Sequence, residues 1–369
     1  MTLGERVDAA IDAALVERIV GCVVLVKRDG VEIYARAAGL ADREAGRAIA
    51  RDSIFRIASV TKPIVATTAL RMAELGLLGL DDPVTRFLPW FTPSAPDGAR
   101  PPILVRHLLT HTSGVGYDVP ADVSTGLSGP SIPLDENLRR LARAPLAFAP
   151  GQGWTYGMGL DVLGGAIAAI EGSSLEAAVA KYVGAPLGMT DTHFYVADEK
   201  RLVAQYADAR PPRRMGDPEP VIDDSGGVVV FSPMRIFDAS APQSGGAGMA
   251  GTADDLMRLL EAYNGAGGLL RADTVAAALA NQVGDVARRP NDAGKRFCLI
   301  GALVADPQAA RTPCPVGAVD WGGAWGCNWI VDPINRLTIV SYANTAFEGC
   351  TGPFRDEVRD AVYGWRSAA

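Results

Sequence analysis

The sequence predicts a mixed α/β (α+β) fold in which one antiparallel sheet is flanked by helices and joined to a mostly helical lobe. Two apolar, β-branched runs at 20–27 and 31–38 are separated by Asp29-Gly30, a pair typical of tight hairpin turns. Strand-like runs return after residue 296, whereas 79–290 is rich in helical patterns and Pro-containing connectors. We therefore expect strands from both ends of the chain to form a single sheet.

Two domains are expected, because the strand-rich ends of the chain enclose its helical middle. The sheet domain comprises residues 1–78 and 291–369, and residues 79–290 form the inserted helical domain. The chain has 369 residues, 48% of them hydrophobic, which is enough for a large buried core.

Helices are predicted from apolar residues three and four positions apart and from their end signals. The first places Val7, Ile11 and Ala14 on one side, and a later one begins at Thr252, with Asp255 three residues on. The predicted helices cover 4–18, 59–75, part of 106–114, 134–144, 161–170, 174–182, 252–263 and 353–365. The predicted strands after the hairpin are 297–305, 318–322, 327–331 and 337–343, with a turn at 332–335 between the last two.

The helix over 59–75, which ends before Gly76, carries the first chemical signal. In Ser59-Val60-Thr61-Lys62 the serine and the lysine lie one turn apart on the same helical face. A serine hydroxyl needs a neighbouring base to become a nucleophile, and a lysine amine serves when burial or nearby positive charge keeps it neutral. The helix is apolar nearly all round, so we expect it to be buried.

Taken alone, this spacing is a weak signal, because serines often cap helices and the pattern arises by chance. A Ser-His-Asp site fits less well, since His107, His111 and His193 accompany no G-x-S-x-G motif, and His111 and Ser113 fit a turn. No group of His, Cys, Asp or Glu has metal-site spacing, and no glycine loop fits a phosphate cradle. We therefore expect no metal site.

Two further stretches supply partners for the serine. Residues 150–159 form a glycine-rich loop with one phenol, Tyr156, which could pass a proton between the serine and a leaving group. A loop tyrosine that only packs its ring is the alternative. Trp321-Gly322-Gly323-Ala324 lies next to a predicted strand, where successive glycines let a ligand approach or mark a β-bulge. An extended backbone there could bind an acyl group and donate one N–H to an oxyanion.

Charge and cysteine content narrow the class of partner. A net charge of −7 without a basic run argues against nucleic acid or an anionic membrane surface. The apolar run at 19–26 is too short to span a bilayer, and no secretory signal precedes it. Five cysteines without metal-type spacing fit no closed disulfide framework. We expect reduced thiols in a cytoplasmic protein that acts on a small molecule, with its oligomeric state open.

The S-x-x-K motif, the tyrosine loop and the small-residue strand together resemble the serine β-lactamase and penicillin-binding-protein superfamily, of class C type. The resemblance covers nearly the whole chain. It also includes the stretches 55–59, 108–114, 150–151, 161–164 and 245–249. The resemblance implies a serine β-lactamase-like fold and an acyl-enzyme formed on a serine, without a cofactor.

Two departures from the lactamase pattern indicate a different substrate. Met158 stands where that pattern has the asparagine of Tyr-x-Asn, and Trp321-Gly322-Gly323 replaces a Lys-Thr-Gly or His-Thr-Gly strand. A thioether and an indole thus replace groups that recognise amides and carboxylates, which favours uncharged, partly apolar acyl or alcohol groups. This combination looks like the family VIII carboxylesterases.

The resemblance to that family implies a role for each matching residue. Ser59 would be the nucleophile, Lys62 the general base for acylation, and Tyr156 a member of the proton relay. The N–H groups of Ser59 and Ala324 would form the oxyanion hole, and Asp161 is expected to cap its helix. The residues expected to line the substrate pocket are Met158, Trp321, Gly322 and Gly323.

The predicted function is cleavage of carboxylic esters of small, largely apolar substrates through an acyl-enzyme at Ser59. The same nucleophile would serve an amidase or D-aminopeptidase, a weak β-lactamase, or an acyltransferase that passes the acyl group to an alcohol. A binding protein that keeps the fold without the chemistry is a further hypothesis, which the intact Ser59, Lys62 and Tyr156 argue against. Esters have the better leaving group, so a site without amide-recognising groups favours them.

Overall fold

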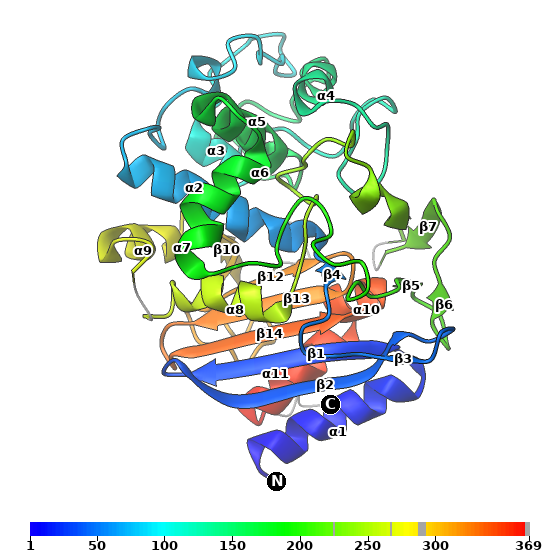
Figure 1. Ribbon diagram of the computed structural model, residues 1–369. Helices are drawn as coiled ribbons and strands as arrows, with labels where there is room; N and C mark the ends of the chain where they lie inside the picture. Colours follow the sequence, from blue (N-terminus) through cyan, green and yellow to red (C-terminus); the bar gives the residue numbers. More distant parts are fainter. Residues whose placement is uncertain (224–225, 266–267, 287–292, 366–369) are drawn as a thin grey trace.

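An eight-stranded antiparallel sheet joins the two ends of the chain, in the order β10-β11-β12-β13-β14-β1-β2-β3 (Figure 1). The structure is a computed structural model that describes residues 1–223, 226–265, 268–286 and 293–365. The strands of this sheet are β1 Gly21–Arg28, β2 Val31–Asp42, β3 Arg47–Ala48, β10 Lys295–Phe297, β11 Ala302–Val304, β12 Val319–Gly323, β13 Cys327–Asp332 and β14 Leu337–Ala343. The predicted sheet of N- and C-terminal strands is confirmed, while the predicted boundary at 290/291 lies outside the described residues.

The β1–β2 hairpin forms as its turn signal predicts. Asp29 and Gly30 have φ angles of 52° and 75°, the left-handed values that a two-residue hairpin turn requires. β1 then pairs with β14 on its other side, with Cys22 opposite Ala343 and Arg28 opposite Leu337. An N-terminal strand thereby lies in the middle of the sheet, held by two neighbours.

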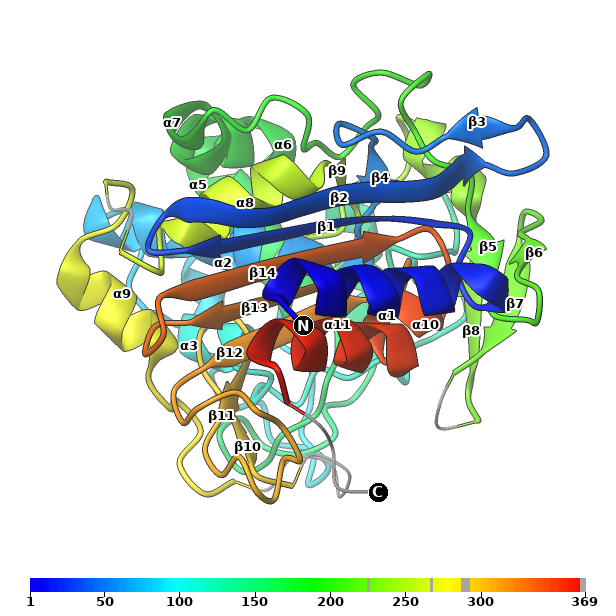
Figure 2. The same cartoon turned by 90° about the horizontal axis from the view of Figure 1, so that it is seen from below.

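Two helices from opposite ends of the chain cover the outer face of the sheet. They are α1 Leu3–Glu17 and α11 Pro353–Tyr363, which lie side by side over this face of the sheet (Figure 2). Side chains of β1 alternate between the faces, so Val24 packs against this outer layer and Val23 against the inner core. Both faces of β1 are therefore buried, which explains its continuous apolar sequence.

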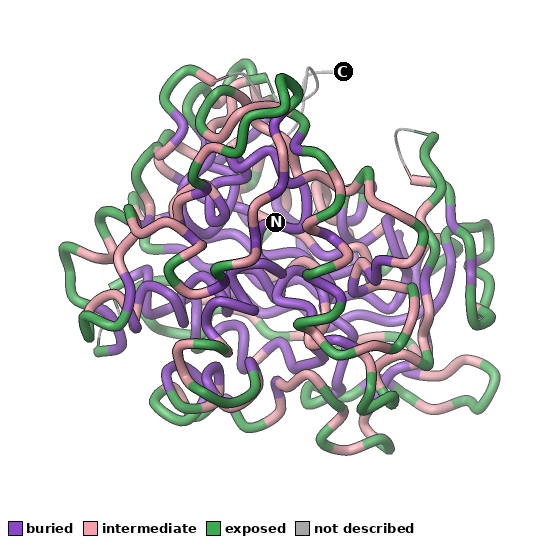
Figure 3. The backbone as a smooth tube through the Cα atoms, turned by 90° about the horizontal axis from the view of Figure 1, so that it is seen from above, coloured by how far each residue is buried: buried purple, intermediate pink, exposed green. Residues whose placement is uncertain are grey.

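The helix that carries the S-x-x-K motif lies between the inner face of the sheet and the helical lobe (Figure 1). It consists of a 3₁₀ turn, η1 Ala58–Val60, followed by α2 Thr61–Glu74, and it ends before Gly76 with φ of 72°. Eleven residues of α2 are buried, as its apolar sequence predicts. Figure 3 shows that buried residues gather at the centre of the molecule.

The helical lobe differs from its prediction in its middle section. Besides helices, it contains the short strand pairs β5–β6 and β7–β8, where the sequence shows a Pro-containing connector and a loop. The remaining helical segments are η2 Val84–Arg86, α3 Val105–Leu109, α4 Leu134–Leu141, α5 Gly159–Glu171, α6 Leu175–Val179, η3 Ala180–Gly184, α7 Ala185–Leu187, η4 Pro233–Phe237, α8 Ala253–Glu261, α9 Ala272–Leu279 and α10 Ala346–Cys350. The remaining strands are β4 Phe55–Arg56, β5 Tyr206–Ala207, β6 Arg213–Arg214, β7 Glu219–Ile222, β8 Val228–Phe231 and β9 Ala250–Gly251.

The strand predicted over 297–305 is wrong as a single element. The chain turns back after β10, where the N–H of Cys298 donates to the carbonyl of Gly301 at 3.0 Å, and returns as β11. Leu299 and Ile300 are apolar because they are buried at this turn, so their pattern does not distinguish it from a strand.

All five cysteines are buried, and each lies outside any disulfide bond. Within the described ranges, no group of three or more His, Cys, Asp or Glu side chains is arranged to hold a metal ion. Across those same ranges no single helix combines the length and apolarity needed to cross a membrane, although the bent pair Gly159–Glu171 and Leu175–Leu187 meets both criteria together.

The outer layer should contribute much of the stability without shaping the inner face. Phe354 of α11 is 0% exposed within this layer, so Phe354→Ala should lower the free energy of unfolding by ~3–5 kcal/mol. Val16→Ala on α1, at a residue 80% exposed, is the control and should change it by less than about 0.5 kcal/mol. Urea titrations followed by tryptophan fluorescence measure both, and equal effects would contradict the proposed packing role.

Candidate active site

Ser59 follows a backbone conformation that few residues other than glycine adopt. Ala58 has φ of 42°, in the left-handed region, so the chain turns sharply just before the serine. The turn is anchored from the other side, because the N–H of Ile57 donates to the carbonyl of Met249 at 3.0 Å beside the short β4–β9 pair. The serine is therefore fixed at the start of the central helix by the distant segment around Met249 and β9.

The amine of Lys62 contacts the hydroxyl of Ser59 as the helical spacing predicts. Its Nζ lies 3.2 Å from Ser59 Oγ, 3.4 Å from the phenol oxygen of Tyr117 and 2.8 Å from the carbonyl oxygen of Gly246. The residue is 4% exposed, and a buried ammonium or amine is stable only when its hydrogen-bonding groups have partners. Three separate segments supply those partners.

The loop before α5 brings Tyr156 to the same serine. Its hydroxyl donates to Ser59 Oγ at 2.6 Å, and its ring lies 4.6 Å from Lys62 Nζ. Other rings surround it, with centroids 4.8 Å away for His111 and 5.3 Å away for Trp321. Serine, lysine and tyrosine are thus in mutual contact, and the ring packing holds the phenol in place.

The end of β12 lies directly against the serine turn. A Cβ atom placed on Gly323 would overlap the carbonyl oxygen of Ile57 and stand 3.3 Å from the backbone nitrogen of Ser59. Only glycine allows this approach, which brings the end of β12 close to the backbone nitrogen of Ser59. Trp321 stands at the other end of this stretch, against Tyr156.

The structure does not bring Met158 to the surface of the site. This residue is 0% exposed and belongs to the main core at the start of α5. Its neighbour in sequence Tyr156 occupies the site instead, because the intervening Gly157 turns the chain against the backbone of residues 115 and 116. The predicted contact between Met158 and a substrate therefore receives no support from its position.

Sequence reasoning missed three groups around Lys62. Tyr117 lies in the loop after the 108–114 stretch and carries no motif of its own, while Gly246 and Asp161 lie within stretches that support the family resemblance without a chemical role. Asp161 is buried, and the hydroxyl of Ser244 donates to its carboxylate. In the sequence, Tyr117 could have been noticed only because it closely follows the 108–114 stretch.

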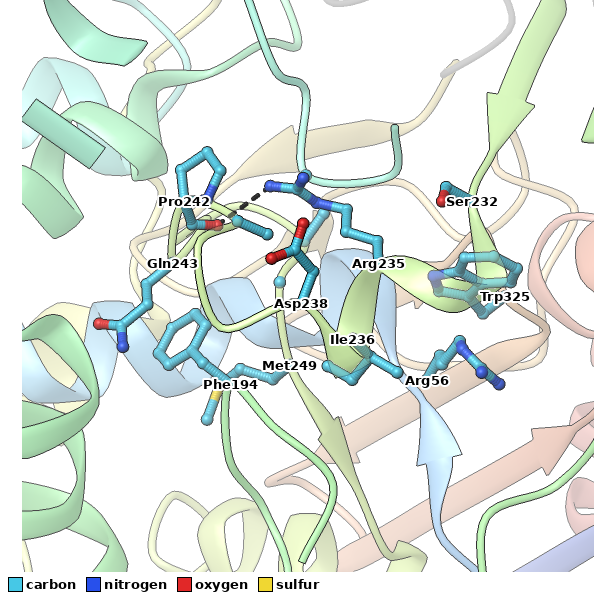
Figure 4. A pocket seen from close by; sticks show the side chains of 14 residues that line it. Arg56, Phe194, Ser232, Arg235, Ile236, Asp238, Pro242, Gln243, Met249 and Trp325 are labelled. Atoms are coloured by element: carbon cyan, nitrogen blue, oxygen red, sulfur yellow. Dashed lines mark hydrogen bonds between the residues drawn. The ribbon is translucent and has the colours of Figure 1, made fainter. Parts of the chain in front are cut away.

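Of two cavities in the structure, one is lined by a catalytic residue and the other is not. A small one beside Lys62 is lined mainly by apolar side chains, namely Ala66, Leu109, His111, Leu160, Phe297, Leu299, Ile300 and Trp321. A second pocket, drawn in Figure 4, is lined by Arg56, Phe194, Arg235, Met249 and Trp325 among others, and none of Ser59, Lys62 and Tyr156 lines it. Burial lowers the pKa of Arg56 to about 10 in this second pocket.

Comparison with known proteins agrees with this geometry. The Beta-lactamase family model matches residues 7–362. Esterase EstB of Burkholderia gladioli is 46% identical over 375 residues, covering 98% of this chain and 95% of that protein. A lovastatin esterase of Penicillium rubens is 27% identical over 89% of each chain.

Among solved structures, EstCE1, described as a hydrolase with promiscuous acyltransferase activity, superposes with a TM-score of 0.92. It is 39% identical, and the match covers 98% of both chains. The predicted superfamily and fold class are confirmed by these matches, and the esterase relatives support the resemblance to family VIII carboxylesterases. This chain therefore belongs to the β-lactamase family.

Proposed function

We propose that the protein is a serine carboxylesterase that cleaves small, largely apolar esters through an acyl-enzyme at Ser59. The observation that carries this proposal is the contact of three groups, with Ser59 Oγ 2.6 Å from the hydroxyl of Tyr156 and 3.2 Å from the amine of Lys62. A hydroxyl with a base and a second proton carrier in contact is the arrangement that nucleophilic acyl transfer needs. The esterase names of two relatives agree with it.

Acylation begins when Ser59 Oγ attacks the ester carbonyl carbon and gives up its proton to the Lys62–Tyr156 pair. The negative charge that develops on the carbonyl oxygen is stabilised by the N–H groups of Ser59 and Ala324. The bond from carbon to the alcohol oxygen then breaks, and the alcohol leaves with a proton delivered through Tyr156. A water molecule attacks the acyl-enzyme, its proton enters the same relay, and the acid leaves as the Ser59 hydroxyl reforms.

Lys62 is assigned as the base and Tyr156 as the group that hands the proton to the leaving alcohol. Lys62 is enclosed by protein, whereas Tyr156 is half-buried and stands between Ser59 and Trp321, where a leaving group has access. The hydroxyl of Tyr117 also contacts the amine of Lys62, so we assign Tyr117 to orienting Lys62.

An apolar substrate follows from the wall beside the nucleophile. Trp321, Phe297 and Ile300 form an apolar wall next to Lys62, and an alkyl or aryl group that packs against this wall buries apolar surface. Gly322 and Gly323 let the extended backbone of β12 approach the acyl group. We assign the apolar part of the substrate to this side.

A second candidate function is transfer of the acyl group to an alcohol. The 39% identical EstCE1 carries acyltransferase activity in its description, and an apolar wall beside the acyl-enzyme disfavours water relative to an alcohol. Both activities share the first half of the reaction and differ only in the acceptor.

The three catalytic assignments predict distinct variant behaviour. Ser59→Ala should abolish turnover of a short-chain p-nitrophenyl ester, while Lys62→Ala and Tyr156→Phe should each lower kcat by roughly 10²–10⁴-fold. Tyr34→Phe is a matched control, since its phenol bonds to Asp8 far along the sheet from Ser59. More than half of wild-type activity in any of the three would show that the role given to that residue is wrong.

The substrate assignment predicts a rank order. Esters should be turned over fastest, D-amino-acid amides and nitrocefin should react far more slowly, and added alcohol should divert part of the acyl group to a new ester. Product analysis with one acyl donor and several acceptors measures this order. Faster turnover of nitrocefin than of any ester would overturn the assignment, and failure of a fluorescent phosphonate to label Ser59 would favour a binding protein.

The close approach of β12 to the serine turn predicts a large effect from one methyl group. Gly323→Ala should lower kcat by about 10²-fold, because its Cβ would overlap the Ile57 carbonyl and push the strand away from the oxyanion donors. Gly4→Ala is the control, since the nearest atom to its Cβ is a Tyr34 ring carbon at 4.0 Å. Wild-type kcat in a folded Gly323→Ala protein would exclude the proposed oxyanion hole.

A further inference from the structure

A carboxylate lies buried next to the residue that binds the catalytic amine. Asp161, in the first turn of α5, is 1% exposed. An aspartate in such a place must have its charge compensated and its oxygens hydrogen-bonded. The expected helix-capping role of Asp161 is wrong, because Met158 is the N-cap of α5 and Asp161 lies inside its first turn.

The carboxylate organises the loop before β9. The hydroxyl of Ser244 donates to Asp161 and accepts from the N–H of Ala247 at 3.0 Å, and the backbone of Gly246 lies directly against the carboxylate. A Cβ atom on Gly246 would lie 2.5 Å from Asp161 Oδ2 and 3.5 Å from Lys62 Nζ. Gly246 therefore lies between the carboxylate of Asp161 and the amine of Lys62, and only a residue without a side chain fits there.

The carbonyl of Gly246 constrains the direction of the amine. It accepts from Lys62 Nζ at 2.8 Å, and a carbonyl oxygen can only accept. One N–H of Lys62 must therefore point at Gly246 in either protonation state. A neutral amine then has its lone pair free to face only the hydroxyls of Ser59 and Tyr117, which is the orientation that proton transfer from Ser59 needs.

Charge balance around this loop involves two cations. Lys62 and Arg235 both act on Asp161 through space, and Arg235 also faces the exposed Asp238. Burial raises the pKa of Asp161, while the hydrogen bond from Ser244, the charge of Lys62 and the N–H of Gly246 oppose that shift. Arg235 also donates to the carbonyl of Pro242 at 3.1 Å, a contact visible in Figure 4, and so holds the same loop from its other side.

We propose that Asp161 is a positioning residue for Lys62: it fixes the 244–247 loop so that the Gly246 carbonyl orients the amine, and its charge stabilises the ammonium that forms when Lys62 accepts the proton of Ser59. The inference rests on the proposed function, in which Lys62 is the base. Asp161 touches neither Ser59 nor a substrate, so it acts only through the loop and through its charge. The hydroxyl of Ser244 and the charge of Lys62 both favour the ionised carboxylate, against the burial that raises its pKa.

Two variants separate the loop from the charge. Asp161→Asn keeps the shape of the side chain but removes its charge, so kcat should fall on the order of tenfold or more, and the rise of kcat/KM with pH should move to lower pH because ammonium is less stabilised. Ser244→Ala leaves the charge and loosens the loop, so kcat should fall without a shift of the profile. KM should change little in both.

The experiment measures ester hydrolysis from pH 5 to 10 for both variants. Thermal unfolding and phosphonate labelling of Ser59 confirm that each variant is folded. Wild-type kcat and an unshifted profile in a folded Asp161→Asn would overturn this inference, as would wild-type kcat in Ser244→Ala if Asp161→Asn does not fold. A fully active Lys62→Ala overturns the proposed function instead, so the two failures are distinguishable.

Discussion

The site depends on keeping one lysine amine buried with all its hydrogen-bonding groups satisfied. Removing a polar group from water costs roughly 2–7 kcal/mol when no hydrogen-bond partner replaces the solvent. A buried amine therefore needs such partners. Here the partners are Ser59, Tyr117 and the carbonyl of Gly246, each from a different segment. The fold can be understood as the means of bringing those segments to the start of α2.

The sheet provides the rigid side of that arrangement. β11 pairs with the start of β12, and the last residues of β12, Gly322 and Gly323, pair with β13 where they meet the serine turn. The other side is formed by loops, and these are stiffened by ring contacts around Tyr156 and by hydrogen bonds around Asp161. Rigidity of both sides matters, because acyl transfer tolerates little displacement of the reacting atoms.

How much of this the sequence could predict depends on the range of the interactions. The Ser59–Lys62 contact is set by helix geometry, and the Asp29-Gly30 hairpin by backbone preference, so both follow from local sequence. The contacts of Tyr117 and Asp161 join loops far apart in the chain, and no local pattern encodes such a meeting. Met158 illustrates the same limit: its alignment with a lactamase asparagine places it near Tyr156 in sequence, yet the turn at Gly157 directs it into the core.

The same electrostatic arrangement also bears on substrate choice. Among the described residues that line the cavity beside Lys62, most are apolar and the exceptions are Lys62 and His111. The donors of Lys62 already face Ser59, Tyr117 and Gly246. A negatively charged substrate group placed against Trp321 and Phe297 would lose its hydration and find no hydrogen-bond donor of Lys62 left to replace it, which is costly. An uncharged ester loses little on entering the same space. The apolar wall and the fully engaged amine therefore favour uncharged esters over charged substrates, because burying an unpaired charge costs free energy.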